Sequence, residues 1–136
     1  DFCLSRGLGD VYKRQLLKKM GFELNGVDFD MLLGAYVLNP SITKNEFKMV
    51  ASSFNYYKLR FDEEVYGKGV KRSIPEPSLL MEHVISKVEC LYLIKNQIIS
   101  SLKENDQYDL LTQIEIPLSR VLGKMEFEGI RLILTN

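Results

Sequence analysis

Two glutamates on one long predicted helix are carboxylates whose spacing gives them a shared face. Glu82 and Glu89 are seven residues apart, so an α-helix places them on nearly the same face. Clustered carboxylates can hold Mg²⁺ or Mn²⁺, which activate a water molecule and stabilise a leaving oxygen. Glutamates are also common on a solvated helix surface, and this second interpretation is the one we favour.

Three further polar residues are weaker candidates. Asp28 and Asp30 resemble a carboxylate pair, but alternate residues of a strand face opposite sides, and Asp30 is placed to cap a helix. His83 is the only histidine and has no second histidine or cysteine at a zinc spacing. We therefore expect His83 to be a half-buried helix residue.

A basic segment beside two glycines is a candidate for contact with nucleic acid. Lys68, Lys71 and Arg72 could bind DNA phosphate groups. The glycines at positions 67 and 69 lack the strand and helix that flank a phosphate-binding loop. We favour an exposed, solvated loop as the explanation of this segment.

The elements that must position these side chains are mostly helices. Apolar spacing predicts five helices. The first ends near Met20, the second runs from an Asp30 cap to Leu38, and the third starts at Thr43 or Asn45 and carries Phe47 to Phe54. The fourth runs from a Ser78 cap to about Leu102, and the fifth covers Leu110 to Met125. Alternating patterns predict short strands at Val27–Phe29 and Ile130–Leu134, and the glycines and prolines of Asp62–Pro77 predict an exposed loop. Pro117 either kinks the last helix or lies in the first turn of a new one.

The first fifteen residues do not have the character of natural protein sequence. Ser5–Gln15, SRGLGDVYKRQ, back-translates without a mismatch to the transposase mosaic-end adaptor that is used to fragment DNA for sequencing. We therefore expect residues 1–15 to be adaptor-derived and disordered, and we exclude them when predicting the fold. The natural sequence is then expected to begin near Leu16 and to be a fragment.

The composition excludes some classes of protein. The 18 basic and 18 acidic side chains cancel, so the chain lacks the basic face of a typical nucleic-acid-binding domain, although a larger parent could carry that charge elsewhere. No apolar run approaches the roughly 20 residues that cross a bilayer. We expect Cys90 to be a small core hydrophobe. The expected class is a cytoplasmic protein with no membrane contact.

Three segments share one resemblance: FDMLLGAYVLNP (29–40), EEVYGKGVK (63–71) and EIPLSRVLGKMEFEGI (115–130). In this order and spacing they resemble bacterial DNA polymerase I, a family A DNA polymerase, where its 3′–5′ exonuclease-type domain meets its polymerase domain. The resemblance implies an α/β fold by parentage, because such a fragment is the C-terminal half of an RNase H-like domain. The fragment itself is expected to be mainly α-helical, with residues 16–106 in the exonuclease-type domain and 107–136 starting the polymerase domain.

In this family the proofreading site takes its carboxylates from three motifs. The first would lie upstream of this chain, and the second would fall near Lys13, among the adaptor-like residues. The third, Tyr-x-x-x-Asp, aligns with His83 and Lys87. Lysine offers only hydrogen-bond donors and a positive charge, so it cannot replace a metal-binding carboxylate. The resemblance thus implies a degenerate exonuclease site, with no catalytic, cofactor-binding or metal-binding residue in this chain.

The expected function is that of a DNA-directed DNA polymerase fragment whose vestigial, inactive exonuclease domain serves as a scaffold. The full-length enzyme would use Mg²⁺ and bind DNA as a cytoplasmic monomer, whereas the fragment would bind no metal and be inactive. Two alternatives remain: an active metal-dependent 3′–5′ exonuclease whose register brings Glu82 or Glu89 to the site, and a non-enzymatic helical scaffold. With its upstream strands missing, the fragment is also expected to expose apolar surface from Val27 to Leu38.

Overall fold

The computed structural model describes residues 9–41 and 46–129, and for residues 9–12 only the backbone is described. No β-strand occurs in these ranges. The elements in chain order are α1 (Gly9–Lys19), α2 (Met31–Leu38), α3 (Phe47–Ser53), α4 (Asp62–Tyr66), the 3₁₀ turn η1 (Gly69–Lys71), α5 (Pro77–Glu104), the π-helical segment η2 (Leu110–Glu115) and α6 (Ile116–Glu128). The expected, mainly α-helical character is therefore confirmed.

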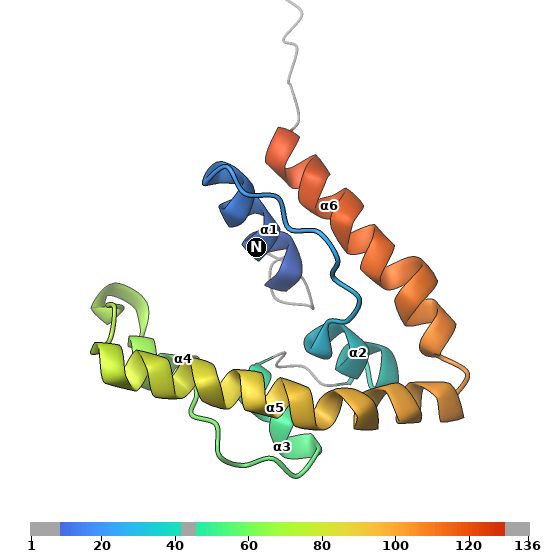
Figure 1. Ribbon diagram of the computed structural model, residues 1–136, viewed down its shortest axis with the longest axis horizontal. Helices are drawn as coiled ribbons and strands as arrows, with labels where there is room; N and C mark the ends of the chain where they lie inside the picture. Colours follow the sequence, from blue (N-terminus) through green and yellow to red (C-terminus); the bar gives the residue numbers. More distant parts are fainter. Residues whose placement is uncertain (1–8, 42–45, 130–136) are drawn as a thin grey trace, which may run out of the picture.

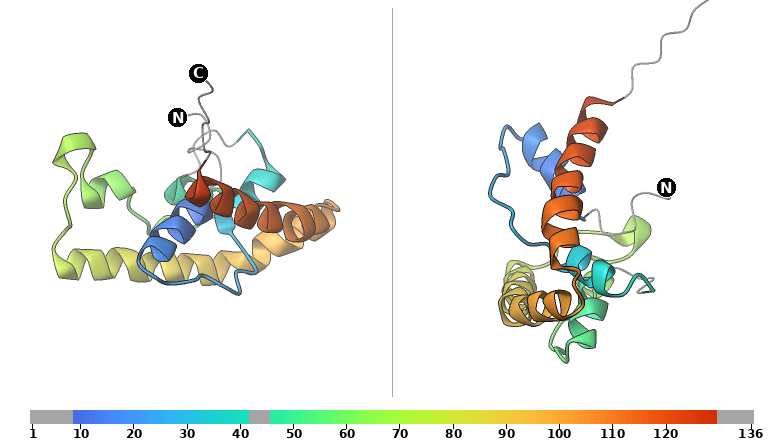
Figure 2. Two further views of the ribbon diagram at one scale, coloured as in Figure 1. Left: turned by 90° about the horizontal axis from the view of Figure 1, so that it is seen from above. Right: turned by 90° about the vertical axis from the view of Figure 1, so that its right-hand side faces the viewer.

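The long helix α5 is the element around which most of the others are arranged (Figure 1). Helices α2, α3 and α4 contact α5, and all three lie on the same side of it in the right-hand view of Figure 2. The chain turns back after α5, and α6 then runs away from the core with α1 packed alongside it (Figure 1). The molecule thus consists of a core around α5 and a projecting pair of helices.

Helix α2 begins at the aspartate of the segment 29–40. The Asp30 carboxylate accepts a hydrogen bond of 2.9 Å from the Leu33 amide and so satisfies a free donor of the first turn. The helix ends at Leu38, because Asn39 precedes Pro40 and takes an extended conformation. Both predicted boundaries are confirmed.

The segment before α2 differs from the prediction. Val27–Phe29 was expected to form a strand, but it has no regular structure and finds no partner strand among the described residues. Its backbone is instead held by a side chain, since Arg120 donates a hydrogen bond of 3.4 Å to the Val27 carbonyl. The second expected strand, Ile130–Leu134, lies outside the described residues.

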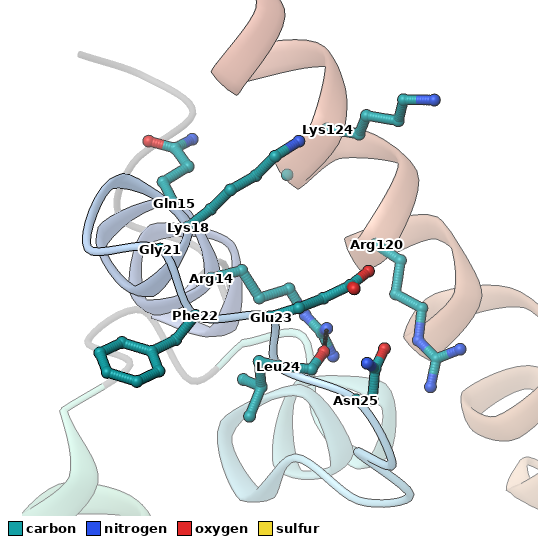
Figure 3. A pocket seen from close by; sticks show the side chains of 11 residues that line it. Arg14, Gln15, Lys18, Gly21, Phe22, Glu23, Leu24, Asn25, Arg120 and Lys124 are labelled. Carbon is teal, nitrogen blue, oxygen red and sulfur yellow. Dashed lines mark hydrogen bonds between the residues drawn. The ribbon is translucent and has the colours of Figure 1, made fainter.

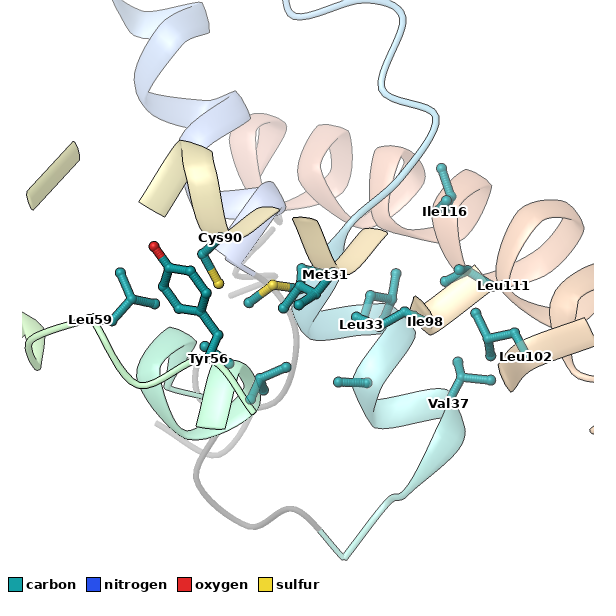
Figure 4. Packing of buried hydrophobic residues seen from close by; sticks show 14 residues of the cluster. Met31, Leu33, Val37, Tyr56, Leu59, Cys90, Ile98, Leu102, Leu111 and Ile116 are labelled. Atoms are coloured by element: carbon teal, nitrogen blue, oxygen red, sulfur yellow. The ribbon is translucent and has the colours of Figure 1, made fainter. Parts of the chain in front are cut away.

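The core lies where α2 crosses α5 (Figure 4). The crossing is close, because a Cβ added to Gly34 would lie 3.0 Å from Ile98 Cγ2. A glycine at this position lets the two helices approach. The largest fully buried side chains are Ile94, Ile98, Leu102, Leu111, Val50 and Cys90.

Pro117 explains the irregular start of the last helix. It lies in the first turn of α6, the second of the two predicted alternatives. Proline has no amide hydrogen, so the regular helical hydrogen-bond ladder cannot continue through it. The Ile116 amide donates to the Leu111 carbonyl five residues back, which is the π-helical pattern of η2. Gly129 ends α6 as predicted, with a φ of 71°.

Of three other predicted boundaries, two need correction and the third lies outside the described residues. The N-cap of α5 is Glu76 rather than Ser78, because Pro77 occupies the first turn and the Glu76 carboxylate accepts a 2.7 Å hydrogen bond from Ser78 Oγ. Asp62–Pro77 is not wholly a loop, since its acidic start forms α4 and η1 follows. Helix α3 is present with Glu46 as its N-cap, while the predicted caps Thr43 and Asn45 lie outside the described residues.

The expected exposure of Val27–Leu38 is wrong. Met31, Leu33, Ala35 and Val37 are buried, because α2 packs against α5 and η2. Many of the exposed apolar side chains instead lie on three other elements. They include Met81, Val84, Ile85, Val88, Tyr92 and Leu93 on α5, Leu110 and Ile114 on η2, and Leu118, Val121 and Met125 on α6.

The disorder expected for residues 1–15 is not found for residues 9–15, which form the first part of α1. Lysine, arginine and glutamine are good helix formers, so these residues extend the helix that Leu16–Lys19 begin. Arg14 also donates a hydrogen bond of 2.7 Å to the Leu24 carbonyl, and Gln15 donates one to Glu126. Residues 1–8 lie outside the described part of the chain.

The buried cysteine gives a first testable prediction. Burial, and secondarily the charge of Glu89, raise the pKa of the Cys90 thiol to about 11 from 9.0. The thiolate is the reactive form, and a pKa that is two units higher reduces the thiolate fraction near pH 8 by about 100-fold. In a Cys3→Ser variant we expect Cys90 to be labelled by a thiol reagent at least that much more slowly than in denaturant. Fast labelling of the folded chain would contradict the burial.

Candidate functional site: an aspartate between His83 and Lys87

The two positions singled out in α5 meet at one carboxylate. Asp62 Oδ1 lies 2.8 Å from His83 Nε2 and also accepts a hydrogen bond from Lys87 Nζ. Asp62 is the first residue of α4, and His83 and Lys87 are one helical turn apart on the face of α5 that α4 covers. The three side chains therefore join α4 to α5.

Asp62 was not among the residues predicted to matter. The segment was expected to be a solvated loop, and helical periodicity relates only positions within one element. The contacts of Asp62 reach 21 and 25 residues along the chain, so no local pattern indicates them. The acidic cluster at the start of α4 was the one available signal, and it does not reveal a partner.

His83 is more buried than expected. Its side chain is only 1% exposed, because α4 covers it and the Tyr66 ring packs edge-on against the imidazole at a centroid distance of 5.7 Å. The predicted half-buried state is therefore wrong. A buried imidazole needs a hydrogen-bond partner, and Asp62 provides it.

The pKa of Asp62 reflects this environment. Partial burial raises the pKa of the carboxyl group, but the hydrogen bonds from Lys87 and His83, together with their charges, outweigh burial and lower it below its ordinary value of 3.8. The carboxylate is thus ionised at neutral pH and balances the ammonium group of Lys87.

The two glutamates on α5 are each held by other partners. Arg60 lies 3.5 Å from Glu82, and the Tyr56 hydroxyl donates a hydrogen bond of 2.8 Å to Glu89. Burial of Tyr56, followed by its hydrogen bond to Glu89, raises the pKa of the phenol to about 12, so it remains a donor. Neither glutamate contacts the Asp62 cluster, which supports the interpretation of a solvated helix face.

The other two candidate carboxylates have different partners and different structural roles. Asp28 forms an ion pair of 3.2 Å with Lys95 on α5, while Asp30 caps α2. They do not form a shared site.

The predicted basic segment lies at the turn η1, and two of its three side chains have local partners. Lys68 lies 3.3 Å from Glu63, and Arg72 lies over the Tyr66 ring at 5.9 Å, while Lys71 belongs to the turn η1. Each of the first two contacts is local to the α4–η1 region. All three side chains are exposed, and their contact with DNA phosphate groups stays a prediction.

The residues of the Asp62 cluster do not fit a divalent metal ion. Such an ion requires several oxygen ligands, whereas here one carboxylate faces an ammonium group and an imidazole. Within residues 9–41 and 46–129, no group of three or more His, Cys, Asp or Glu residues is placed to hold a metal. In the same ranges no helix is long and apolar enough to cross a membrane.

A pH titration can test the role of Asp62. Its pKa is lowered in the folded state, so its contribution to stability is present above the unfolded pKa, near 3.8, and is lost as the pH falls through the lower folded value. We expect the chain to be more stable than the Asp62→Asn variant at pH 6, as measured by urea unfolding. The difference in stability should disappear at a pH below the folded-state pKa of Asp62. A difference independent of pH would contradict the ionised pair.

A cavity lies elsewhere, between α1, residues 21–25 and α6 (Figure 3). It has a volume of about 450 Å³, and Arg14 and Lys18 of α1 line it together with Arg120 and Lys124 of α6. Arg14 and Gln15 in its wall fall within the adaptor-like stretch. The cavity wall therefore includes residues that the sequence predicts to be adaptor-derived.

Comparisons with known proteins agree with the sequence resemblance. A family model described as "DNA polymerase I, ribonuclease H-like domain" matches residues 11–94. The DNA polymerase I of Geobacillus stearothermophilus is 40% identical over 116 residues, which cover 85% of this chain and 13% of that protein. The DNA polymerase I of Bacillus subtilis is 36% identical over 116 residues, and that of Lactococcus lactis subsp. lactis is 39% identical over 117, each with 13% of the relative covered. The chain thus spans about one eighth of the length of these relatives.

Proposed function

Because this chain belongs to the family of the DNA polymerase I ribonuclease H-like domain, we propose that its parent is a bacterial DNA-directed DNA polymerase. We further propose that this domain is a vestigial proofreading exonuclease, inactive in hydrolysis and kept as a scaffold. The relatives with 36–40% identity, all named DNA polymerase I, support the first part. The second part depends on the Asp62 cluster.

The observation that carries the proposed inactivity is the ammonium group of Lys87 on Asp62. Lys87 stands where the resemblance places a metal-binding aspartate, and it contacts the nearest carboxylate. A cation bound there would be repelled by Lys87 and would have to displace it from Asp62. The neighbouring His83 is buried and already paired, so the cluster serves to hold α4 on α5.

The alternative of an active exonuclease requires Glu82 or Glu89 to reach the site. Both glutamates lie on the exposed side of α5, where they contact Arg60 and Tyr56. Moving either one to the Asp62 cluster would need a rotation of α5 that exposes Cys90 and Ile94, which are buried. The packing of α5 therefore favours the vestigial domain.

The remaining parts of the proposal concern the whole protein. We propose that residues 1–15 are adaptor-encoded, that residues 16–106 belong to the exonuclease-type domain, and that the polymerase domain starts near residue 107. The end of α5 at Glu104 supports that last boundary. The parent would act as a cytoplasmic monomer on DNA, with Mg²⁺ at a polymerase site outside this chain.

An assay of the full-length parent tests the proposal. We expect it to extend a primer on a template with deoxynucleotides and Mg²⁺, and to leave a 3′-labelled strand intact when nucleotides are withheld. A proofreading polymerase serves as the positive control for degradation. Metal-dependent 3′ degradation that Glu82→Gln or Glu89→Gln abolishes would overturn the vestigial assignment, and failure to extend primers would overturn the polymerase assignment.

A further inference from the structure

The segment between α1 and α2 carries a reactive pair of neighbouring residues, Asn25 and Gly26. Asparagine is one of the thermally labile residues of proteins, because the backbone amide nitrogen of the next residue can attack its side-chain amide carbon. A glycine at the next position leaves that nitrogen unshielded and gives the backbone the freedom to approach. Asn25 is the only asparagine that precedes a glycine in this sequence.

The structure leaves both reacting groups free. Asn25 is exposed and lies in the stretch 22–30, which has no regular structure. Within residues 9–41 and 46–129, no hydrogen bond engages the Asn25 side chain or the Gly26 amide nitrogen. Gly26 has a φ of 72°, and a Cβ added there would find no atom within 4 Å. The two groups can therefore approach each other without breaking a contact.

The other described asparagines lack such a nucleophile. Asn39 precedes a proline, which has no amide hydrogen to lose. The amides that follow Asn55 and Asn105 donate hydrogen bonds of 3.0 and 3.2 Å to backbone carbonyls. Asn96 is exposed but lies inside α5, where the helical hydrogen-bond ladder holds the backbone amides. Among the described residues, Asn25 alone thus combines exposure with a free amide at the next position.

The surroundings of Asn25 favour negative charge. Asn25 lines the cavity between α1 and α6 together with three cations outside the adaptor-like stretch, Lys18, Arg120 and Lys124 (Figure 3). Glu23 is the acidic side chain in the same lining. Attack by a deprotonated amide nitrogen brings negative charge onto the side-chain carbonyl oxygen of Asn25, and nearby cations stabilise that charge.

We propose that Asn25 is a site of spontaneous deamidation in the parent protein. The Gly26 nitrogen gives its proton to water and bonds to Cγ of Asn25, and the side-chain amide leaves as ammonia. Water then opens the resulting succinimide ring. Cleavage at Cγ gives aspartate, whereas cleavage at the main-chain carbonyl gives isoaspartate. One water molecule is consumed, one ammonia is released and nothing is oxidised or reduced.

The modification changes the charge and the backbone of this segment. Both products add a carboxylate to the cavity lined by Arg120 and Lys124. Isoaspartate also lengthens the main chain by one methylene group, because the chain then passes through Cβ and Cγ of residue 25. The inference does not depend on the proposed polymerase activity, since it rests on the exposure and hydrogen bonding of two neighbouring residues.

Mass spectrometry of the full-length parent, aged in mildly alkaline buffer, tests the proposal. Asn25 and Asn39 share the tryptic peptide 20–44, so fragmentation of that peptide compares a reactive position with an internal control. Asn96 gives a second control on another peptide. A carboxyl methyltransferase specific for isoaspartate, used as a reagent, distinguishes the two products.

We expect aspartate and isoaspartate to accumulate at position 25 while Asn39 and Asn96 stay intact. Gly26→Ala should slow the reaction at least about tenfold, because the added methyl group shields the nitrogen. Asn25→Gln should form no isoaspartate, since attack would have to close a larger ring. The second variant leaves Gly26 and its positive φ untouched, so it also serves if alanine disturbs the segment.

Three results would overturn the proposal. The first is an intact Asn25 in the parent after the isolated peptide 20–44 has reacted, which would show that the folded protein protects it. The second is an equal rate at Asn39 or Asn96. The third is aspartate without isoaspartate, which would indicate direct hydrolysis and exclude attack by Gly26.

Discussion

Replacing Ile98 by alanine is expected to lower the free energy of unfolding by about 2–5 kcal/mol, the largest effect that we predict for a single side chain. Ile98 is 0% exposed and fills the crossing of α2 and α5, where Gly34 brings the two helices together. The cavity left by the deletion cannot close, because both backbones are already in close approach. Urea unfolding followed by circular dichroism measures the change.

The same helix offers a control of the same residue type. Ile85→Ala removes identical atoms from a position that is 58% exposed, so we expect a change within about 0.5 kcal/mol. If the chain proves too weakly stable for Ile98→Ala to fold, Ile98→Val should still cost about 0.5–1.5 kcal/mol. Similar losses for Ile98→Ala and Ile85→Ala would contradict the assignment of the two faces.

Replacing Lys87 by aspartate should have the largest electrostatic effect. The substitution removes the ammonium group from Asp62 and places a second carboxylate beside it, so attraction becomes repulsion. Because the Asp62 side chain is 55% exposed, solvent screens the interaction, and we expect a loss of about 1–2 kcal/mol in unfolding free energy at pH 7. Acidification should reduce the loss as the carboxylates become protonated.

Lys87→Met is the matched control, since it removes the charge but keeps much of the apolar stem. We expect it to be less destabilising than Lys87→Asp at pH 7, and we expect its smaller loss to disappear on acidification as Asp62 becomes protonated. In an Asp62→Asn background the difference between the two substitutions should shrink, as a double-mutant cycle measures. If Lys87→Asp is no less stable than Lys87→Met, Asp62 and Lys87 do not form the pair described here.

Several local boundaries of the fold followed from the amino-acid sequence alone. The cap at Asp30, the stop before Pro40 and the helix end at Gly129 depend on the chemistry of one or a few neighbouring residues, so a pattern within a short window is sufficient to predict them. The same holds for the long helix α5, whose apolar spacing predicts its existence and most of its length. The resemblance of segments 29–40, 63–71 and 115–130 likewise indicated the family that the comparisons later identified.

Only the tertiary structure decided which apolar face is buried and which carboxylate meets Lys87. The sequence shows apolar residues on α2, α5 and α6, but burial depends on which elements lie nearby. Most of the apolar residues of α2 are buried, whereas Ile85, Val88 and Tyr92 of α5 are exposed. Similarly, Asp62 joins His83 and Lys87 across more than twenty residues of chain. Such contacts are set by the packing of whole helices, a property that no local pattern contains.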